Sequence, residues 1–253
     1  MSAPESGENP LTSEDASQNA NTPSTMYETG EYLANNAEWH IGDSSFKAAQ
    51  VKTILDRNGI KPASFVEVGC GAGGILTELS HAFPAANFVG YDISPQAHAL
   101  SQTRRSDRVE FRQSDFLATE DHYDCLMAMD VFEHVEDYMG FVRGLSKRAT
   151  CSIFHIPMEI NFVSILRGNM IDSRKKVGHL HYFSRDTALA TLKDCGYDIV
   201  DDFYTESFRR LPRPALKNKL TGAIYRAVFS RSKDLAVKLF GDCSLIVLAR
   251  PQK

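Results

Sequence analysis

The chain has 253 residues, which is enough for one sizeable α/β domain with additions. Hydrophobic residues make up 43% and charged residues 24%, as is typical of a folded domain. The formal net charge of −4 gives no overall field that would attract nucleic acid, so a nucleic-acid partner is disfavoured. Five scattered cysteines without a CxxC pair favour reduced thiols over a disulfide framework or a zinc site.

Residues 1–25 contain almost no large apolar side chains. We expect a disordered tail there, because such a segment cannot bury enough surface to offset the entropy lost on ordering. The tail has no basic-then-apolar signal pattern, and no apolar run approaches the roughly 20 residues of a membrane span. These features predict a cytoplasmic protein whose folded domain spans residues 26–253.

From residue 31 onward, the pattern predicts alternating helices and strands. Two helical pieces are expected in 31–58, the second capped by Asp43 or Ser44. Strands are predicted at 64–69, 87–93, 109–115, 123–129, 150–157, 197–204 and 244–249, and helices at 75–83, from Ser94, at 137–147 and at 184–195. This alternation is typical of βαβ units. The expected fold class is therefore α/β: a Rossmann-like, mostly parallel seven-stranded sheet with helices on both faces.

Two segments fall outside this alternation. One, at about 158–183, follows the fifth predicted strand, and the other, at about 207–241, separates the last two strands. We expect both insertions to form a cap over the carboxyl ends of the strands, where open α/β sheets bind ligands.

A glycine-rich loop follows the first predicted strand, where residues 66–74 read VEVGCGAGG. Glycines permit a tight turn and let a ligand approach the backbone closely. Gly69, Gly71 and Gly74 also satisfy the GxGxxG dinucleotide pattern, so NAD is an alternative ligand. Asp92 ends the second strand 23 positions after Gly69, where a carboxylate can accept both hydroxyls of a ribose.

Two later motifs complete the set: SDF at 114–116 and YDCLMAMDVFEHVED at 123–137. Together with the glycine loop and FVGYDIS at 88–94, they resemble the class I S-adenosylmethionine-dependent methyltransferases. Within that class the chain looks most like the branch that includes ubiquinone-biosynthesis O-methyltransferases. The resemblance covers roughly 64–158, and GHLHYFS at 178–184 extends it. It implies S-adenosylmethionine as cofactor and does not specify the methyl acceptor.

The resemblance also implies roles at matching positions. The residues that would surround the donor are Glu67, Gly69 and Gly71 at its methionine end, Asp92 and Ile93 at the ribose and adenine, Asp115 and Phe116 at the adenine, and Asp130 and Val131 beside the sulfonium. An acidic pocket edge suits a sulfonium cation, whereas the pyrophosphate of a dinucleotide prefers helix N-termini and basic groups.

Candidate catalytic groups are the histidines near the same edge of the sheet. Methyl transfer depends on holding the acceptor atom in line with the methyl group, and a hydroxyl acceptor also needs a base, for which histidine is suited near neutral pH. His134 is the first candidate because it directly follows the fourth strand, and His179 and His181 are the others. Each could instead satisfy backbone groups. His155, inside an apolar strand, is expected to be a hydrogen-bonded core residue.

A metal site is a second interpretation of the turn after the fourth strand. Asp130, Glu133 and His134 offer two carboxylates and an imidazole within five positions, a set that suits magnesium or a similar divalent ion. Some members of the resembling branch are described as using a divalent ion at matching positions. Carboxylates beside a sulfonium explain the same residues without a metal.

Residues 209–238 carry nine basic side chains and a single acidic one, with apolar residues at helical spacing. Three interpretations remain open: a cap helix with solvated charges, a site for an anionic acceptor, and an amphipathic helix that binds a membrane surface.

The motifs together predict a methyltransferase acting on a small molecule. We expect O-methylation of a sugar, aromatic or quinone-precursor hydroxyl, because residues 130–133 read DVFE and lack the Asn/Asp-Pro-Pro-aromatic motif typical of amino-group DNA methylation. The alternatives are a noncatalytic donor-binding regulator or partner subunit and an NAD-dependent enzyme, although no Tyr-x-x-x-Lys pair is recognisable on a helix.

Overall fold

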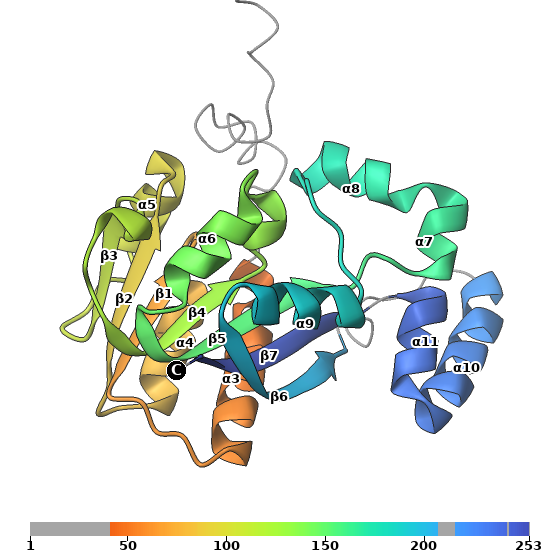
Figure 1. The fold of residues 1–253 in the computed structure, drawn as a ribbon, viewed down its shortest axis with the longest axis horizontal. Coiled ribbons are helices and arrows are strands. Elements are labelled where there is room, and N and C mark those ends of the chain that lie inside the picture. The colour runs from red at the N-terminus through yellow and green to blue at the C-terminus, as the bar shows by residue number, and fades with distance from the viewer. Residues whose placement is uncertain (1–40, 207–215, 242, 253) are drawn as a thin grey trace, which may run out of the picture.

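The computed structural model describes residues 41–206, 216–241 and 243–252. The predicted tail at 1–25 and the first predicted helical piece, before residue 41, lie outside these ranges. The elements are, in chain order, η1 (Ile41–Asp43), α3 (Ser44–Arg57), β1 (Ser64–Val68), α4 (Gly74–Ala82), β2 (Asn87–Asp92), α5 (Pro95–Gln102), β3 (Val109–Gln113), η2 (Phe116–Ala118), β4 (Tyr123–Met129), η3 (Phe132–His134), α6 (Tyr138–Leu145), β5 (Ala149–Pro157), α7 (Phe162–Arg167), α8 (Asn169–Val177), α9 (Arg185–Asp194), β6 (Tyr197–Thr205), α10 (Leu216–Arg231), α11 (Lys233–Phe240) and β7 (Ser244–Pro251) (Figure 1).

The seven strands found in the described ranges belong to one sheet with the order β3-β2-β1-β4-β5-β7-β6. Strands β1 to β5 pair in parallel, and β7 pairs antiparallel with both β5 and β6. The predicted Rossmann-like, mostly parallel sheet is therefore confirmed. The strand order reverses between β1 and β4, and ligands bind at such a switch point in open α/β sheets.

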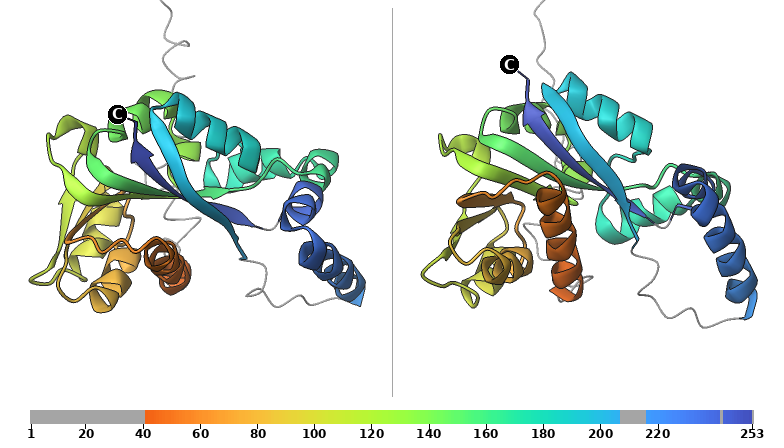
Figure 2. Two further views of the ribbon diagram at one scale, coloured as in Figure 1. Left: turned by 60° about the horizontal axis from the view of Figure 1, so that its bottom comes forward. Right: turned by 90° about the horizontal axis from the view of Figure 1, so that it is seen from below.

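One apolar core covers each face of the sheet. The side chains of β4 alternate between these two cores. Cys125 and Met127 pack in the core that includes α3 and α4. Leu126 and Ala128 pack in the other core, with α6 and α9. Successive side chains of a strand point to opposite faces, so a strand buried on both sides is apolar throughout. Figure 2 shows helices on both sides of the sheet.

Local capping signals fix where several helices begin. The side chain of Ser94 accepts a hydrogen bond from the backbone N–H of Ala97 at the start of α5, and Asp137 and Ser184 cap α6 and α9 in the same way. Asp43 is the N-cap residue of α3, one of the two predicted positions, but its side chain makes no capping hydrogen bond.

The two segments expected to form a cap are mainly helical where the structure describes them. The first contains α7 and α8, and the described part of the second contains α10 and α11. Helix α7 packs against both α8 and α11, to the right of the sheet in Figure 1. Val177 and His179 from the first segment line the cavity described below, whereas no described residue of 207–241 does.

Candidate functional site

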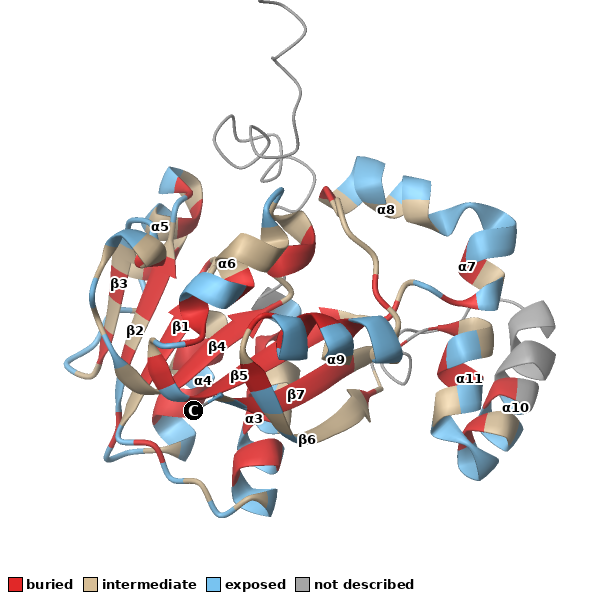
Figure 3. Ribbon diagram, in the orientation of Figure 1, coloured by how far each residue is buried: buried red, intermediate tan, exposed pale blue. Residues whose placement is uncertain are grey.

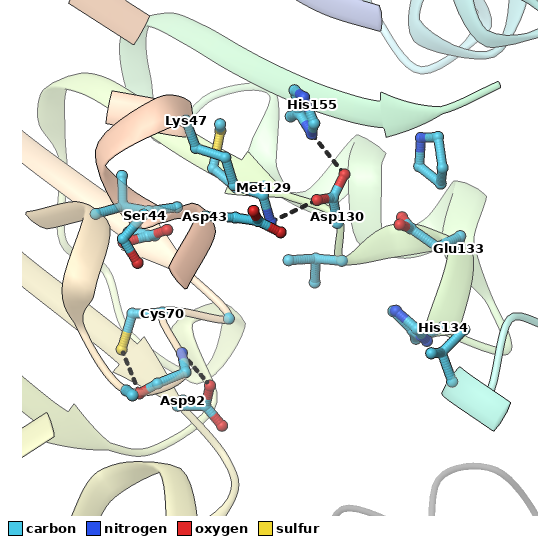
Figure 4. Close-up of a pocket in the computed structure, with 18 of the residues that line it drawn as sticks. Asp43, Ser44, Lys47, Cys70, Asp92, Met129, Asp130, Glu133, His134 and His155 are labelled. Carbon is cyan, nitrogen blue, oxygen red and sulfur yellow. Dashed lines mark hydrogen bonds and ion pairs between the residues drawn. The ribbon is translucent and has the colours of Figure 1, made fainter. Parts of the chain in front are cut away.

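A cavity of about 560 Å³ opens at the carboxyl ends of β1, β2 and β4 (Figure 4). Its wall combines the glycine loop, the start of α3, the turns after β2 and β4, and the segment after α8. Of the residues predicted from the sequence, the following line it: Glu67, Gly69, Gly71, Asp92, Ile93, Asp130, Val131, Glu133, His134 and His179.

The glycine loop needs glycine for both conformation and space. Gly69 and Gly73 have φ angles of 75° and 78°, in the left-handed region that other residues rarely adopt. A Cβ atom on Gly69 would lie 2.7 Å from a methyl group of Val131, and one on Gly73 would lie 2.4 Å from the ring of Phe111. The loop can therefore turn tightly from β1 into α4 beneath the cavity.

Asp92 fixes the edge of this loop. Its carboxylate accepts hydrogen bonds from the backbone N–H groups of Gly71 at 2.8 Å and Ser94 at 2.9 Å. Burial raises the pKa of Asp92, and these two bonds partly oppose that shift. The next side chain, Ile93, is exposed and gives the cavity an apolar wall beside the carboxylate.

Glu67 is a buried acid at the base of the cavity. Its Oε2 atom has no hydrogen-bond partner within the described part of the chain. Burial raises the pKa of Glu67 to about 8, with Asp92 adding to the shift and Lys47 opposing it. The carboxyl group is therefore mostly neutral at pH 7, and a cationic ligand group beside it would favour its ionised form.

Asp130 is held by two partners: Lys47, which sequence reasoning missed, and His155, whose predicted place as a hydrogen-bonded core residue is confirmed. Its carboxylate lies 2.6 Å from Nζ of Lys47 and 2.6 Å from Nδ1 of His155. Dashed lines in Figure 4 mark both contacts. Nε2 of His155 lies in turn 2.9 Å from the hydroxyl of Thr205. Although burial raises the pKa of Asp130, His155 and Lys47 outweigh it and hold this pKa well below its usual range. Asp130 is thus ionised and internally paired, with its backbone at a φ of 59°.

Two of the three candidate histidines come together. The ring centroids of His134 and His179 lie 4.7 Å apart. Nδ1 of His179 lies 2.6 Å from Oε2 of Glu159, whose other oxygen accepts a hydrogen bond from the hydroxyl of Ser173 at 2.5 Å. His179 therefore belongs to a carboxylate–histidine pair, and Glu159 is a further residue that sequence reasoning missed.

The third candidate, His181, lies apart from this pair. Its Nε2 atom lies 3.0 Å from the carbonyl oxygen of Val135, so this nitrogen carries a hydrogen and donates. The ring packs 4.3 Å from that of Tyr138, centroid to centroid, and does not line the cavity. The arrangement favours the backbone-satisfying role for His181.

Asp115 and Phe116 also lie off the cavity wall. The side chain of Asp115 accepts a hydrogen bond from the backbone N–H of Leu117 and caps η2. The ring of Phe116 is buried in the core, in edge-on contact with Tyr91. The resemblance implied that both side chains contact the adenine. In the structure, each side chain contacts other parts of the chain.

The side chains that lie close enough together to hold a metal ion differ from the predicted metal ligands, which were Asp130, Glu133 and His134. Glu133, His134 and His179 bring one ligand atom each within 4.8 Å of one another, so His179 takes the place of Asp130. Burial raises the pKa of Glu133 well above its usual value, with Asp130 adding to the shift. A neutral carboxylic acid is a poor metal ligand, so this set fits an ion only if binding expels the proton.

Comparison with known proteins agrees with this fold. The Synechocystis magnesium protoporphyrin IX methyltransferase, solved with bound SAH, has a TM-score of 0.56 at 17% identity over 83% of each chain. The Haloferax volcanii methyltransferase solved in complex with the Trm112 activator has a TM-score of 0.65 at 14% identity, covering 88% of this chain and 98% of that one. The chain therefore shares its fold with these two proteins.

A family model described as a methyltransferase domain matches residues 43–202, more than half of the chain. The chain belongs to this methyltransferase family, and the cofactor is S-adenosylmethionine, as the motifs predicted. Curated relatives are the malonyl-[acyl-carrier protein] O-methyltransferases of Bacillus cytotoxicus, 35% identical over 95 residues, and Bacillus anthracis, 30% identical over 103 residues. These matches cover 36% and 39% of this chain but only 33% and 38% of the relatives.

Among the described residues, no helix is long and apolar enough to cross a bilayer.

Proposed function

We propose that this protein transfers the methyl group of S-adenosylmethionine to an oxygen atom of a small molecule. One observation carries the proposal. A single cavity has an acidic end, formed by Glu67 and Asp92, and also contains the adjacent rings of His134 and His179. The named activity of the curated relatives, methylation of an acyl-carrier malonyl group on oxygen, supports an oxygen acceptor.

The acidic end suits the donor. Glu67 offers an unpartnered carboxylate oxygen to the α-amino group of the donor's methionine part, and Asp92 offers oxygen atoms to its ribose. Exposed Ile93 offers an apolar surface to the adenine ring. The pyrophosphate of a dinucleotide would instead lie beside Glu67 and Asp130, and an acidic wall disfavours NAD.

The histidine end suits the acceptor. With Nδ1 of His179 donating its hydrogen to Glu159, the imidazole keeps a lone pair on Nε2. That nitrogen accepts the proton of an acceptor hydroxyl as the oxygen attacks the sulfonium methyl group in line. The carbon–oxygen bond forms, the carbon–sulfur bond breaks, and neutral S-adenosylhomocysteine leaves. Glu159 fixes the ring and stabilises the imidazolium that results.

This mechanism needs no metal ion. Asp130, the ionised carboxylate of the predicted set, is paired with Lys47 and His155, and burial favours the neutral form of Glu133. We therefore expect turnover to survive exhaustive chelation. Loss of turnover that Mg²⁺ or Mn²⁺ restores would instead assign Glu133, His134 and His179 to a metal.

Calorimetric titration with S-adenosylmethionine, S-adenosylhomocysteine and NAD tests the donor site. Asp92→Ala should lose the adenosyl ligands, whereas Asp198→Ala, an exposed position on β6 off the cavity wall, should keep them. NAD binding, or no adenosyl-ligand binding by the native chain, would overturn the proposal.

An acceptor screen with labelled donor then tests the reaction. It should include hydroxylated aromatics, sugars and acyl compounds with a free carboxylate. Donor binding without turnover on any acceptor would favour a noncatalytic donor-binding subunit.

A further inference from the structure

Helix α7 presents an apolar face that nothing described in the structure covers. Phe162, Ile165 and Leu166 are 57%, 58% and 69% exposed. Their spacing of three and four positions places them on one side of the helix, whereas Ser164 is buried on another. Large apolar side chains are commonly exposed singly, but a contiguous set on one helix face marks an interaction surface.

Helix α8 follows α7 directly after Gly168 and adds positive charge. No residue of α8 is buried, and its ribbon in Figure 3 is coloured as exposed and intermediate. Ile171 is 55% exposed. Exposed Arg174 and Lys175 lie three and four positions after Ile171, hence on its side of the helix. Arg167 and Lys176 add two more exposed cations, against the exposed Asp172.

We propose that α7 and α8 together bind the surface of an anionic lipid bilayer. The pattern of exposed aliphatic and aromatic side chains bordered by basic ones is that of a helix lying in the interface between headgroups and acyl chains. The apolar residues insert at that boundary, and the cations attract anionic headgroups. The excess of positive charge on this surface complements such a membrane, although the whole chain is acidic.

This surface differs from residues 209–238, where the sequence suggested membrane binding. In α10, the aromatic side chains of Tyr225 and Phe229 are buried, and the ring of Tyr225 packs against that of Phe240 in α11. Described apolar residues of α10 are thus used within the fold. In α7, by contrast, Phe162, Ile165 and Leu166 remain available.

Binding through α7 and α8 has a consequence for the cavity. Helix α8 ends at Val177, which lines the cavity together with His179 two residues later. A membrane-bound α8 therefore places this wall of the cavity close to the headgroup layer, within reach of an acceptor held in the bilayer. The inference concerns the surface alone and does not depend on the acceptor's chemistry.

Co-sedimentation of the full chain with vesicles tests the proposal. We expect binding to phosphatidylcholine vesicles that contain phosphatidylglycerol, and weaker binding to phosphatidylcholine alone. The double variant Ile165→Ser/Leu166→Ser should lower the partition coefficient about tenfold or more, since each lost side chain removes apolar burial. Lys175→Gln/Lys176→Gln should lose most of the preference for the anionic vesicles.

Matched variants make the result decisive. Val200→Ser removes an exposed apolar side chain on β6 and should bind like the native chain. Arg226→Gln/Arg231→Gln removes exposed charges on α10 and should also have little effect. Thermal melting shows whether each variant is folded. Absence of binding to the anionic vesicles, or equal binding by the Ile165/Leu166 variant, would overturn the proposal. So would self-association of the native chain that this variant abolishes, which would assign the surface to a second copy.

Discussion

Glu67 links the donor site to pH. The folded chain holds the proton on Glu67 up to about pH 8, whereas the ordinary glutamate pKa is 4.5. Between these values the folded state binds more protons than the unfolded state, so the contribution of Glu67 to the free energy of unfolding falls as the pH rises. A cationic donor beside Glu67 reverses the preference of this group for its protonated form, because the positive charge stabilises the carboxylate.

Donor binding at pH 7 should therefore release about one proton from Glu67. Calorimetry in two buffers with different ionisation enthalpies measures this number directly. The apparent affinity should rise with pH and level off above about pH 8. Glu67→Gln should abolish the proton release, and an unchanged release in this variant would assign the proton to another group.

Glu159 is expected to act as a positioning residue for His179. Replacing Glu159 with Gln removes the negative charge that orients the ring and stabilises the imidazolium, so kcat should fall about 100-fold. The donor dissociation constant should stay within twofold of the native value, since Glu159 does not line the cavity. Glu159→Asp should restore part of kcat. An unchanged kcat and pH–rate profile in the Gln variant would limit Glu159 to a structural role.

At the scale of elements, the glycine loop depends on packing against neighbouring strands. Gly73→Ala forces a Cβ atom to within 2.4 Å of the Phe111 ring at a φ of 78°. We expect the free energy of unfolding to fall by about 2–4 kcal/mol, because overpacking and backbone strain add. Urea unfolding measures the change.

Gly42→Ala is the matched control for this substitution. A Cβ atom on Gly42 would meet nothing within 4 Å, and its φ is not in the left-handed range. Equal losses of stability in the two variants would show that the close contact at Gly73 is not the cause.

Elements whose signals are local could be predicted from the sequence. Strand β4 has the predicted bounds, Tyr123–Met129, because a run of apolar residues lies between polar turns. The start of α5 followed from Ser94 and Pro95, which cap a helix within three residues. The glycine loop could also be predicted, because a tight turn with left-handed φ angles needs glycine whatever the surrounding fold.

The side-chain partners in the site could not be predicted in this way. Lys47, Asp130 and His155 belong to α3, the turn after β4, and β5, so their contact exists only after the sheet and its helices have assembled. The different surroundings of His179 and His181 depend on the path of an irregular segment, for which periodicity gives no guide. No local pattern distinguishes these arrangements.

For the whole molecule, the cavity wall joins segments that are distant in sequence. Lys47 from α3, Glu67 from β1, Asp130 after β4 and His179 after α8 all line it. In the unfolded chain these groups are dispersed, so a donor-sized ligand that contacts several of them binds the folded state alone. Binding then stabilises the fold as a unit, by an amount that its concentration and affinity determine.

S-adenosylhomocysteine at 100 times its dissociation constant should therefore raise the free energy of unfolding by about 2.7 kcal/mol. For a domain of this size the melting temperature should rise by roughly 5–10 °C. Differential scanning calorimetry measures the shift. Asp92→Ala should lose most of it at the same ligand concentration, and NAD should produce none. An equal shift with NAD would mean that the glycine loop binds a dinucleotide, because only the adenosine portion is shared by the two ligands.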